Sequence, residues 1–127
     1  MTSVVGVGID LVDVGRLSSA MARRPGLAAR IFTPAERDSP AAGSRVAERL
    51  AARFAAKEAT MKALGVGLGA FSLRDVEVVT DASGRPSLRL HGAAGERARG
   101  LGVGALAVSL SHTATLATAV VVAEAGA

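Results

Sequence analysis

The longest regular pattern in the chain is a helix-forming stretch at residues 44–64, and it limits the possible folds more than any other segment. Ser44 can cap its start, and Gly65 can end it. Apolar side chains recur near one face at helical spacing. They are Val46, Leu50, Phe54, Met61 and Leu64. We expect Phe54, Met61 and Leu64 to anchor this helix in the core.

Strand patterns lie on both sides of the long helix. Residues 3–14 are β-branched and apolar, residues 72–92 form two alternating runs around the turn at 83–86, and residues 104–125 predict two strands that meet near His112 and Thr113. Short helices are predicted in four places. They are residues 15–24, 27–32, 33–38 and 93–102. The third has Thr33 as its N-cap and Glu36 in a capping box. This order predicts a single α+β domain over residues 1–127 with antiparallel strand pairing.

Composition narrows the class of protein. With three Phe, no Tyr and no Trp, the core must be aliphatic, which favours additional burial between subunits. The absence of cysteine excludes disulfides and thiolate sites and fits a cytoplasmic protein. No apolar run approaches the roughly 20 residues of a membrane span, and no signal peptide is recognisable. The net charge of +4 suits anionic partners, but the scarcity of aromatic side chains disfavours nucleic acid.

Several common catalytic patterns are incomplete. Gly6 and Gly8 lack the third glycine and the following helix of a dinucleotide-binding turn, because Leu11 stands in the third position. The glycine-rich residues 65–71 follow a helix and not a strand. With only two histidines, His91 and His112, neither a zinc site nor a serine–histidine–acid triad has positive support.

Two acidic residues are more informative. Asp10 lies inside an apolar strand, where an unpaired carboxylate is costly, so we expect a cation beside it. Glu58 stands four residues before Lys62, and a simple helical ion pair worth about 0.2–0.5 kcal/mol would explain it. The alternative is that Asp10 and Glu58 together hold Mg²⁺, which prefers oxygen ligands.

The long helix also carries a repeating positive charge. Arg45, Arg49, Arg53 and Lys57 recur every four residues and form a stripe of like charges, which is unfavourable unless an anion is nearby. Glu48 can relieve part of the repulsion. A phosphate-bearing ligand would relieve the rest.

Five separated segments resemble motifs of the holo-acyl-carrier-protein synthases. They are GIDLVDVGRL at 8–17, RIFTPAE at 30–36, RFAAKEATMKALGVGLG at 53–69, SGRP at 83–86 and SLSHT at 109–113. The segments follow the order and spacing of that family over nearly the whole chain.

This resemblance implies transfer of 4′-phosphopantetheine from coenzyme A to a serine of apo-acyl carrier protein, with release of adenosine 3′,5′-bisphosphate, for fatty-acid or polyketide synthesis. It implies the small phosphopantetheinyl transferase fold, a mostly antiparallel sheet on a long helix, in homotrimers with active sites between neighbours. The resemblance leaves two alternatives for the general base, Glu58 and a metal-bound water.

The resemblance also assigns residues. Asp10 and Glu58 match the Mg²⁺ ligands, and Lys62 joins them as a catalytic residue beside coenzyme A phosphate. The implied coenzyme A contacts are Arg53, Lys62, Ser83, Gly84, Arg85, Pro86, His112 and Thr113, with Ser83 in place of the commoner asparagine. The family docks acidic carrier proteins on its first helix, where Arg16, Arg23 and Arg24 supply positive charge.

A second class of function competes with this one. A non-catalytic basic module would bind an acidic protein or nucleic acid in a salt-dependent way without turnover. Such a module places no requirement on Asp10.

Overall fold

The computed structural model describes residues 3–38 and 45–126, and it confirms the predicted α+β class. Its main sheet has the strand order β1-β5-β4, with β1 at Val4–Asp13, β5 at Leu116–Ala125 and β4 at Val103–His112, all antiparallel. The predicted hairpin forms a second sheet from β2, Val76–Thr80, and β3, Pro86–Leu90. Strands β1 and β4 are thus the two edges of the main sheet.

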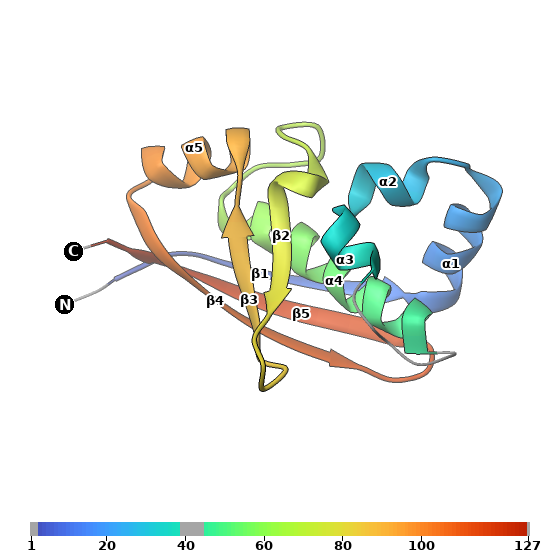
Figure 1. Ribbon diagram of the computed structural model, residues 1–127. Helices are drawn as coiled ribbons and strands as arrows, with labels where there is room; N and C mark the ends of the chain where they lie inside the picture. The colour runs from blue at the N-terminus through green and yellow to red at the C-terminus, as the bar shows by residue number, and fades with distance from the viewer. Residues whose placement is uncertain (1–2, 39–44, 127) are drawn as a thin grey trace.

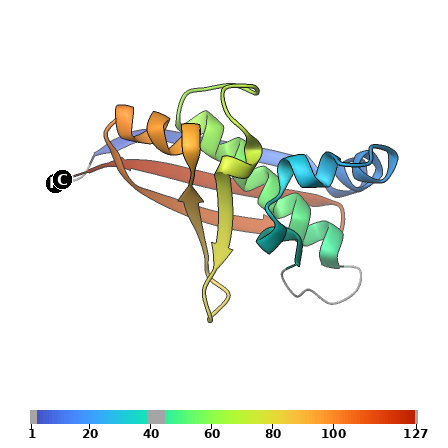
Figure 2. The same cartoon turned by 45° about the horizontal axis from the view of Figure 1, so that its top comes forward.

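The long helix α4, Arg45–Ala63, runs along one face of the main sheet (Figures 1 and 2). The short helices α1, Val14–Arg23, α2, Leu27–Ile31, and α3, Pro34–Asp38, lie together at one end of it. The 3-10 turn η1, Leu73–Asp75, precedes the hairpin, and α5, Gly92–Gly100, connects the hairpin to β4. The predicted Ser44 cap and the turn at 39–44 fall outside the described residues.

Helix α4 approaches β1 so closely that only glycine fits between them. A Cβ atom added to Gly6 would lie 1.9 Å from the carbonyl oxygen of Ala63, and one added to Gly8 would lie 1.8 Å from that of Ala59. The helix meets the sheet through a row of small buried side chains. They are Ala51, Ala52, Ala55, Ala56, Ala59 and Ala63. The first glycine cluster is therefore a packing feature, which agrees with its rejection as a phosphate loop.

The predicted apolar face of α4 is only partly correct. Met61 and Leu64 are buried, but Phe54 is half-buried and Val46 is 37% exposed. Because the alanine row fills the contact with the sheet, the larger side chains lie beside that contact and not at its centre. The predicted stop is confirmed, since Gly65 takes a φ of 72° and its N–H donates to the carbonyl of Lys62 at 3.1 Å.

The positive stripe of α4 runs from an exposed residue, Arg45, to buried ones, Arg53 and Lys57. Lys57 is fully buried, and its Nζ donates to Glu36 Oε1 at 2.8 Å and to the carbonyls of Leu73 and Val76 at 3.1 and 2.5 Å. Burial lowers the pKa of Lys57, and the hydrogen bond and charge of Glu36 oppose that shift.

Glu36 has a second role beyond the predicted capping box. The box forms, since the backbone N–H of Glu36 donates to Thr33 Oγ1 at 3.2 Å and that of Thr33 donates to Glu36 Oε1 at 2.9 Å. Its other oxygen, Oε2, accepts from the Val78 N–H at 3.0 Å. The Glu36–Lys57 pair therefore ties α3, α4 and β2 together in the interior.

This pair generates a prediction about stability. Glu36→Gln or Lys57→Met alone leaves a buried charge without its partner and should lower the free energy of unfolding by about 3–5 kcal/mol. The double variant Glu36→Gln/Lys57→Met should lose clearly less than the sum of the two. Urea denaturation of all four proteins measures the coupling, and additive losses would show that the pair is not an energetic unit.

Candidate functional site

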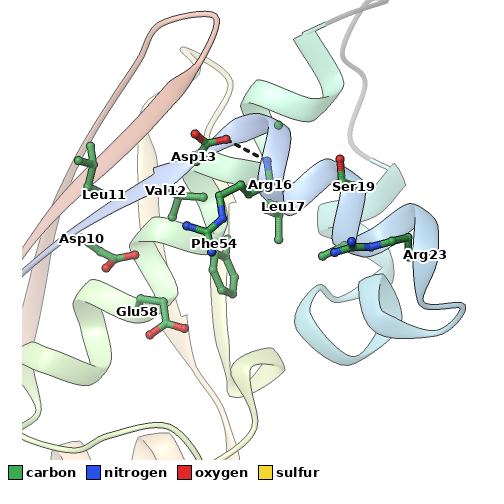
Figure 3. Close-up of a pocket in the computed structure, with 12 residues that line it drawn as sticks. Asp10, Leu11, Val12, Asp13, Arg16, Leu17, Ser19, Arg23, Phe54 and Glu58 are labelled. Atoms are coloured by element: carbon green, nitrogen blue, oxygen red, sulfur yellow. Dashed lines mark hydrogen bonds between the residues drawn. The ribbon is translucent and has the colours of Figure 1, made fainter.

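Two of the cavities that border α4 contain most of the predicted site residues. The first, of about 860 Å³, lies between the end of β1, helix α1 and α4, and it is lined by Asp10, Arg16, Arg23, Phe54 and Glu58 among others. Figure 3 shows the Asp10 and Glu58 carboxylates at one end of this cavity, Arg23 at the other, and Arg16 between them. We call it the acidic cavity after the two carboxylates.

Local structure fixes the residues of the acidic cavity. Asp10 sits in β1 with its backbone paired to Ala119 of β5, and Glu58 projects from α4. Asp13 accepts a hydrogen bond from the Arg16 N–H at 2.9 Å and so caps α1, which begins where β1 ends. Leu17 is buried beneath the helix. Arg16 and Arg23 are thereby held on the cavity side of α1, whereas Arg24 follows the helix and does not line the cavity.

The surroundings of Glu58, including Asp10, change its pKa. Burial raises the pKa of Glu58, and repulsion from Asp10 raises it further, while attraction to Lys62 acts in the opposite direction. The expected cation beside Asp10 is present, because Lys62 Nζ lies 3.2 Å from Asp10 Oδ1. The simple Glu58–Lys62 helical pair is thus replaced by a contact between α4 and β1.

The acidic pair suits a hard divalent cation. Carboxylate oxygens are the ligands that Mg²⁺ prefers, and a cation between these two groups would relieve their repulsion. Among the described residues, no group of three or more His, Cys, Asp or Glu side chains could hold a metal by itself. Such an ion would therefore take its remaining ligands from water and from a bound phosphate.

The second cavity, of about 480 Å³, lies on the other side of α4, at the β4 edge of the sheet. It is lined by Arg49, Arg53, Gly84, Arg85, Pro86 and His112, with Ala52, Val78, Thr80, Val108, Ser109 and Leu110. We call it the basic cavity. It brings together Arg53, most of the hairpin turn and His112, as the sequence predicts for a coenzyme A site.

The basic cavity holds more positive charge than its surroundings balance. Arg53 is only 6% exposed, and burial together with repulsion from Arg49 lowers its pKa, while attraction to Glu36 acts in the opposite direction. The Nε atoms of Arg49 and Arg53 are buried without a hydrogen-bond partner among the described residues. Glu48, expected to relieve the stripe, instead lies 3.2 Å from the His112 ring. An anionic ligand would supply the missing negative charge.

Two predicted contacts, Ser83 and Thr113, lie outside the basic cavity, and one residue of the cavity, Arg49, was not predicted. Ser83 does not line the basic cavity, and its hydroxyl donates to Asp81 Oδ1 at 2.5 Å, which shapes the hairpin turn. Thr113 lies in the β4–β5 turn, where its Oγ1 accepts from the Leu116 N–H at 3.1 Å. Arg49 was not predicted as a site residue, although its place in the stripe was the available signal.

The acidic and basic cavities lie at opposite edges of the main sheet. Asp10 of β1 and Leu110 of β4 both pair with Ala119 of the central strand, so their backbones are two strand spacings, about 10 Å, apart. Helix α4 packs over the sheet between them. The structure thus brings Asp10, Glu58 and Lys62 together and brings Arg53, Gly84, Arg85, Pro86 and His112 together, but it does not join the two groups within one chain.

Comparison with known proteins places this arrangement in a family. Residues 6–117 match the model of the 4′-phosphopantetheinyl transferase superfamily. The chain is 50% identical over 117 residues, 92% of its length and 91% of its relative, to a holo-[acyl-carrier-protein] synthase of Moorella thermoacetica. Its structure is similar to that of the Neisseria meningitidis holo-[acyl-carrier-protein] synthase, with a TM-score of 0.84, 35% identity and coverage of 95% and 98% of the two chains.

The Helicobacter pylori holo-[acyl-carrier-protein] synthase, solved in complex with coenzyme A, is also similar. The two structures superpose with a TM-score of 0.77 and share 30% sequence identity, and the match covers 92% of this chain and 98% of the Helicobacter pylori chain. Within the described part of the chain, no helix is both long and apolar enough to cross a bilayer.

Arg53, the buried arginine of the basic cavity, generates a prediction about stability. Arg53→Met removes a buried guanidinium whose Nε has no hydrogen-bond partner among the described residues, together with its repulsion from Arg49. It should therefore raise the free energy of unfolding by about 1 kcal/mol in the absence of ligand. Urea denaturation measures it, with the exposed Arg99→Met as the matched control that should change little. A loss of several kcal/mol in Arg53→Met would mean that the guanidinium is structural.

Proposed function

Because the chain belongs to the 4′-phosphopantetheinyl transferase superfamily, we propose that it is a Mg²⁺-dependent enzyme that moves 4′-phosphopantetheine from coenzyme A to a serine of apo-acyl carrier protein. Its class of activity is that of the holo-[acyl-carrier-protein] synthases, to which its relatives over most of the chain belong. Adenosine 3′,5′-bisphosphate is the second product. The observation that carries the proposal is the Asp10–Glu58 pair in a cavity lined by arginines of α1.

The reaction exchanges a phosphoanhydride bond of coenzyme A for a phosphate ester bond on the carrier serine. The serine oxygen of the carrier attacks the phosphorus that bears the pantetheine group, and the bond from that phosphorus to the adenosine 3′,5′-bisphosphate oxygen breaks. Mg²⁺ held by Asp10 and Glu58 would neutralise charge on the pyrophosphate. Lys62 is close enough to Asp10 to reach the same phosphates, and Glu58 borders the cavity where the serine must enter, in position to accept its proton.

The carrier protein would approach along α1. Arg16 and Arg23 border the acidic cavity, so an acidic carrier attracted to them brings its serine toward Asp10 and Glu58. Phe54 contributes apolar surface to the same cavity. Arg24, exposed just beyond the helix, extends the positive surface and would steer the encounter without lining the site.

A homotrimer with active sites between neighbours is part of this proposal, and two observations support it. Coenzyme A would need the acidic cavity for its pyrophosphate and the basic cavity for its other phosphate, yet one chain keeps these at opposite sheet edges. The sheet face away from α4 also exposes a row of apolar side chains. They are Val5, Val7, Ile9, Leu11 and Val120, with Ile9 63% and Leu11 65% exposed. Such a surface favours association with another copy.

A transfer assay tests the proposed function. Apo-acyl carrier protein incubated with the enzyme, coenzyme A and Mg²⁺ should gain the mass of one phosphopantetheine, and EDTA should prevent the gain. Asp10→Asn and Glu58→Gln should each slow transfer about a hundredfold or more without unfolding the protein. Glu96→Gln, on the exposed side of α5, is the matched control and should keep full activity.

The same assay separates the enzyme from a basic binding module. No mass gain with several carriers, together with salt-sensitive carrier binding that survives Asp10→Asn, would support the module and contradict the enzyme.

A further inference from the structure

The ammonium group of Lys62 lies on the carboxylate to which the proposed function assigns a metal ion. Its Nζ donates to Asp10 Oδ1 at 3.2 Å and to the carbonyl oxygen of Ile9 at 2.8 Å. Asp10 is 18% exposed and Lys62 is 54% exposed at the side chain. The lysine thus reaches from α4 across to β1 and contacts both the backbone and the side chain of that strand.

This contact gives Asp10 a counter-ion supplied by the chain itself. Lys62 is the single cation within ion-pair distance of Asp10 in the described part of the chain, and Glu58 lies on the same side of α4 one turn earlier. A divalent cation that binds between Asp10 and Glu58 must therefore compete with a positive charge that is already there. It must displace the ammonium group or accept the repulsion of a cation a few ångströms away.

The Lys62–Asp10 ion pair can also break without disturbing the core. Lys62 has a flexible four-carbon stem, and about half of its side chain is exposed, so the ammonium group can leave β1 without unpacking the core. Lys57, five residues earlier on the same helix, is the contrast. It is fully buried and held by three acceptors, and it has no such freedom.

We propose that Lys62 is a resident counter-ion that keeps Asp10 from binding a divalent cation tightly until a pyrophosphate draws the ammonium group away. Cation and coenzyme A then enter the acidic cavity together, because the phosphates offer Lys62 a new partner and the metal additional oxygen ligands. The inference rests on the proposed function in that the displacing ligand is coenzyme A. The competition for Asp10 is a property of the chain alone.

The competition is measured without any transfer reaction. Mn²⁺, which shares the preference for oxygen ligands, is titrated into the full-length protein in the absence of coenzyme A, and free Mn²⁺ is followed by electron paramagnetic resonance. Lys62→Met removes the charge and keeps an unbranched side chain. It should bind one Mn²⁺ at least threefold more tightly than the unmodified protein does.

Two further variants locate the effect. Lys62→Arg keeps a cation near Asp10 and should bind Mn²⁺ no more tightly than the unmodified protein. Asp10→Asn in the Lys62→Met background should abolish the gain, because the released carboxylate is removed. Lys62→Gln, a neutral polar replacement, repeats the measurement if Lys62→Met fails to give a cooperative thermal transition.

The outcomes decide the inference independently of the enzyme assay. Equal or weaker Mn²⁺ binding in both neutral variants would overturn it, as would an equal gain in Lys62→Arg. A gain in the neutral variants of a protein that transfers no phosphopantetheine would uphold the competition at Asp10 and leave the proposed function contradicted. Phosphopantetheine transfer by the unmodified protein, without tighter Mn²⁺ binding in the neutral variants, would uphold the proposed function and overturn the competition at Asp10.

Discussion

The close contact between α4 and β1 determines where the carboxylates of Asp10 and Glu58 lie. Gly8 abuts the carbonyl of Ala59, and Gly6 abuts that of Ala63, so the strand and the helix run past each other in a fixed register. Two residues of a strand and four residues of a helix advance by nearly the same distance, about 6–7 Å. The residue two positions after Gly8 in β1 therefore lies about one helical turn before Ala59 along α4. Asp10 follows on the same face of β1, and it is thereby brought to the turn of α4 that carries Glu58.

The opposite side of α4 is held by a different kind of interaction. Lys57, next to Glu58 in sequence, points into the interior. Its ammonium group binds the Glu36 carboxylate and the carbonyl oxygens of Leu73 in η1 and Val76 in β2. One turn earlier, Arg53 faces the basic cavity at the other edge of the sheet. A single helix therefore presents an acidic group to one edge and a basic group to the other. In the proposed homotrimer, a second copy of the chain would bring the basic cavity to the coenzyme A molecule held at the acidic cavity.

Local sequence rules predicted most of the elements, because β-branched runs, the capping box at Thr33 and the stop at Gly65 depend on near neighbours. They also identified Asp10 as anomalous in its strand. They could not show that Lys57 is buried, since its partner Glu36 lies 21 residues away and already served as a helix cap. The packing role of Gly8 and the inclusion of Arg49 in the basic cavity likewise depend on tertiary contacts. No pattern of neighbouring residues in the sequence indicates that the acidic cavity lies at the β1 edge of the sheet and the basic cavity at the β4 edge.

The central claim is that acidic and basic cavities of different copies form one active site, and subunit mixing tests it most directly. Asp10→Asn and Arg53→Met chains, each impaired alone, are co-expressed and purified as mixed oligomers. Random assembly would leave about a quarter of the interfaces with both cavities intact. Phosphopantetheine transfer should then recover to about that fraction of the unmodified rate. Mixed oligomers no more active than the average of the two separate variants would contradict the claim.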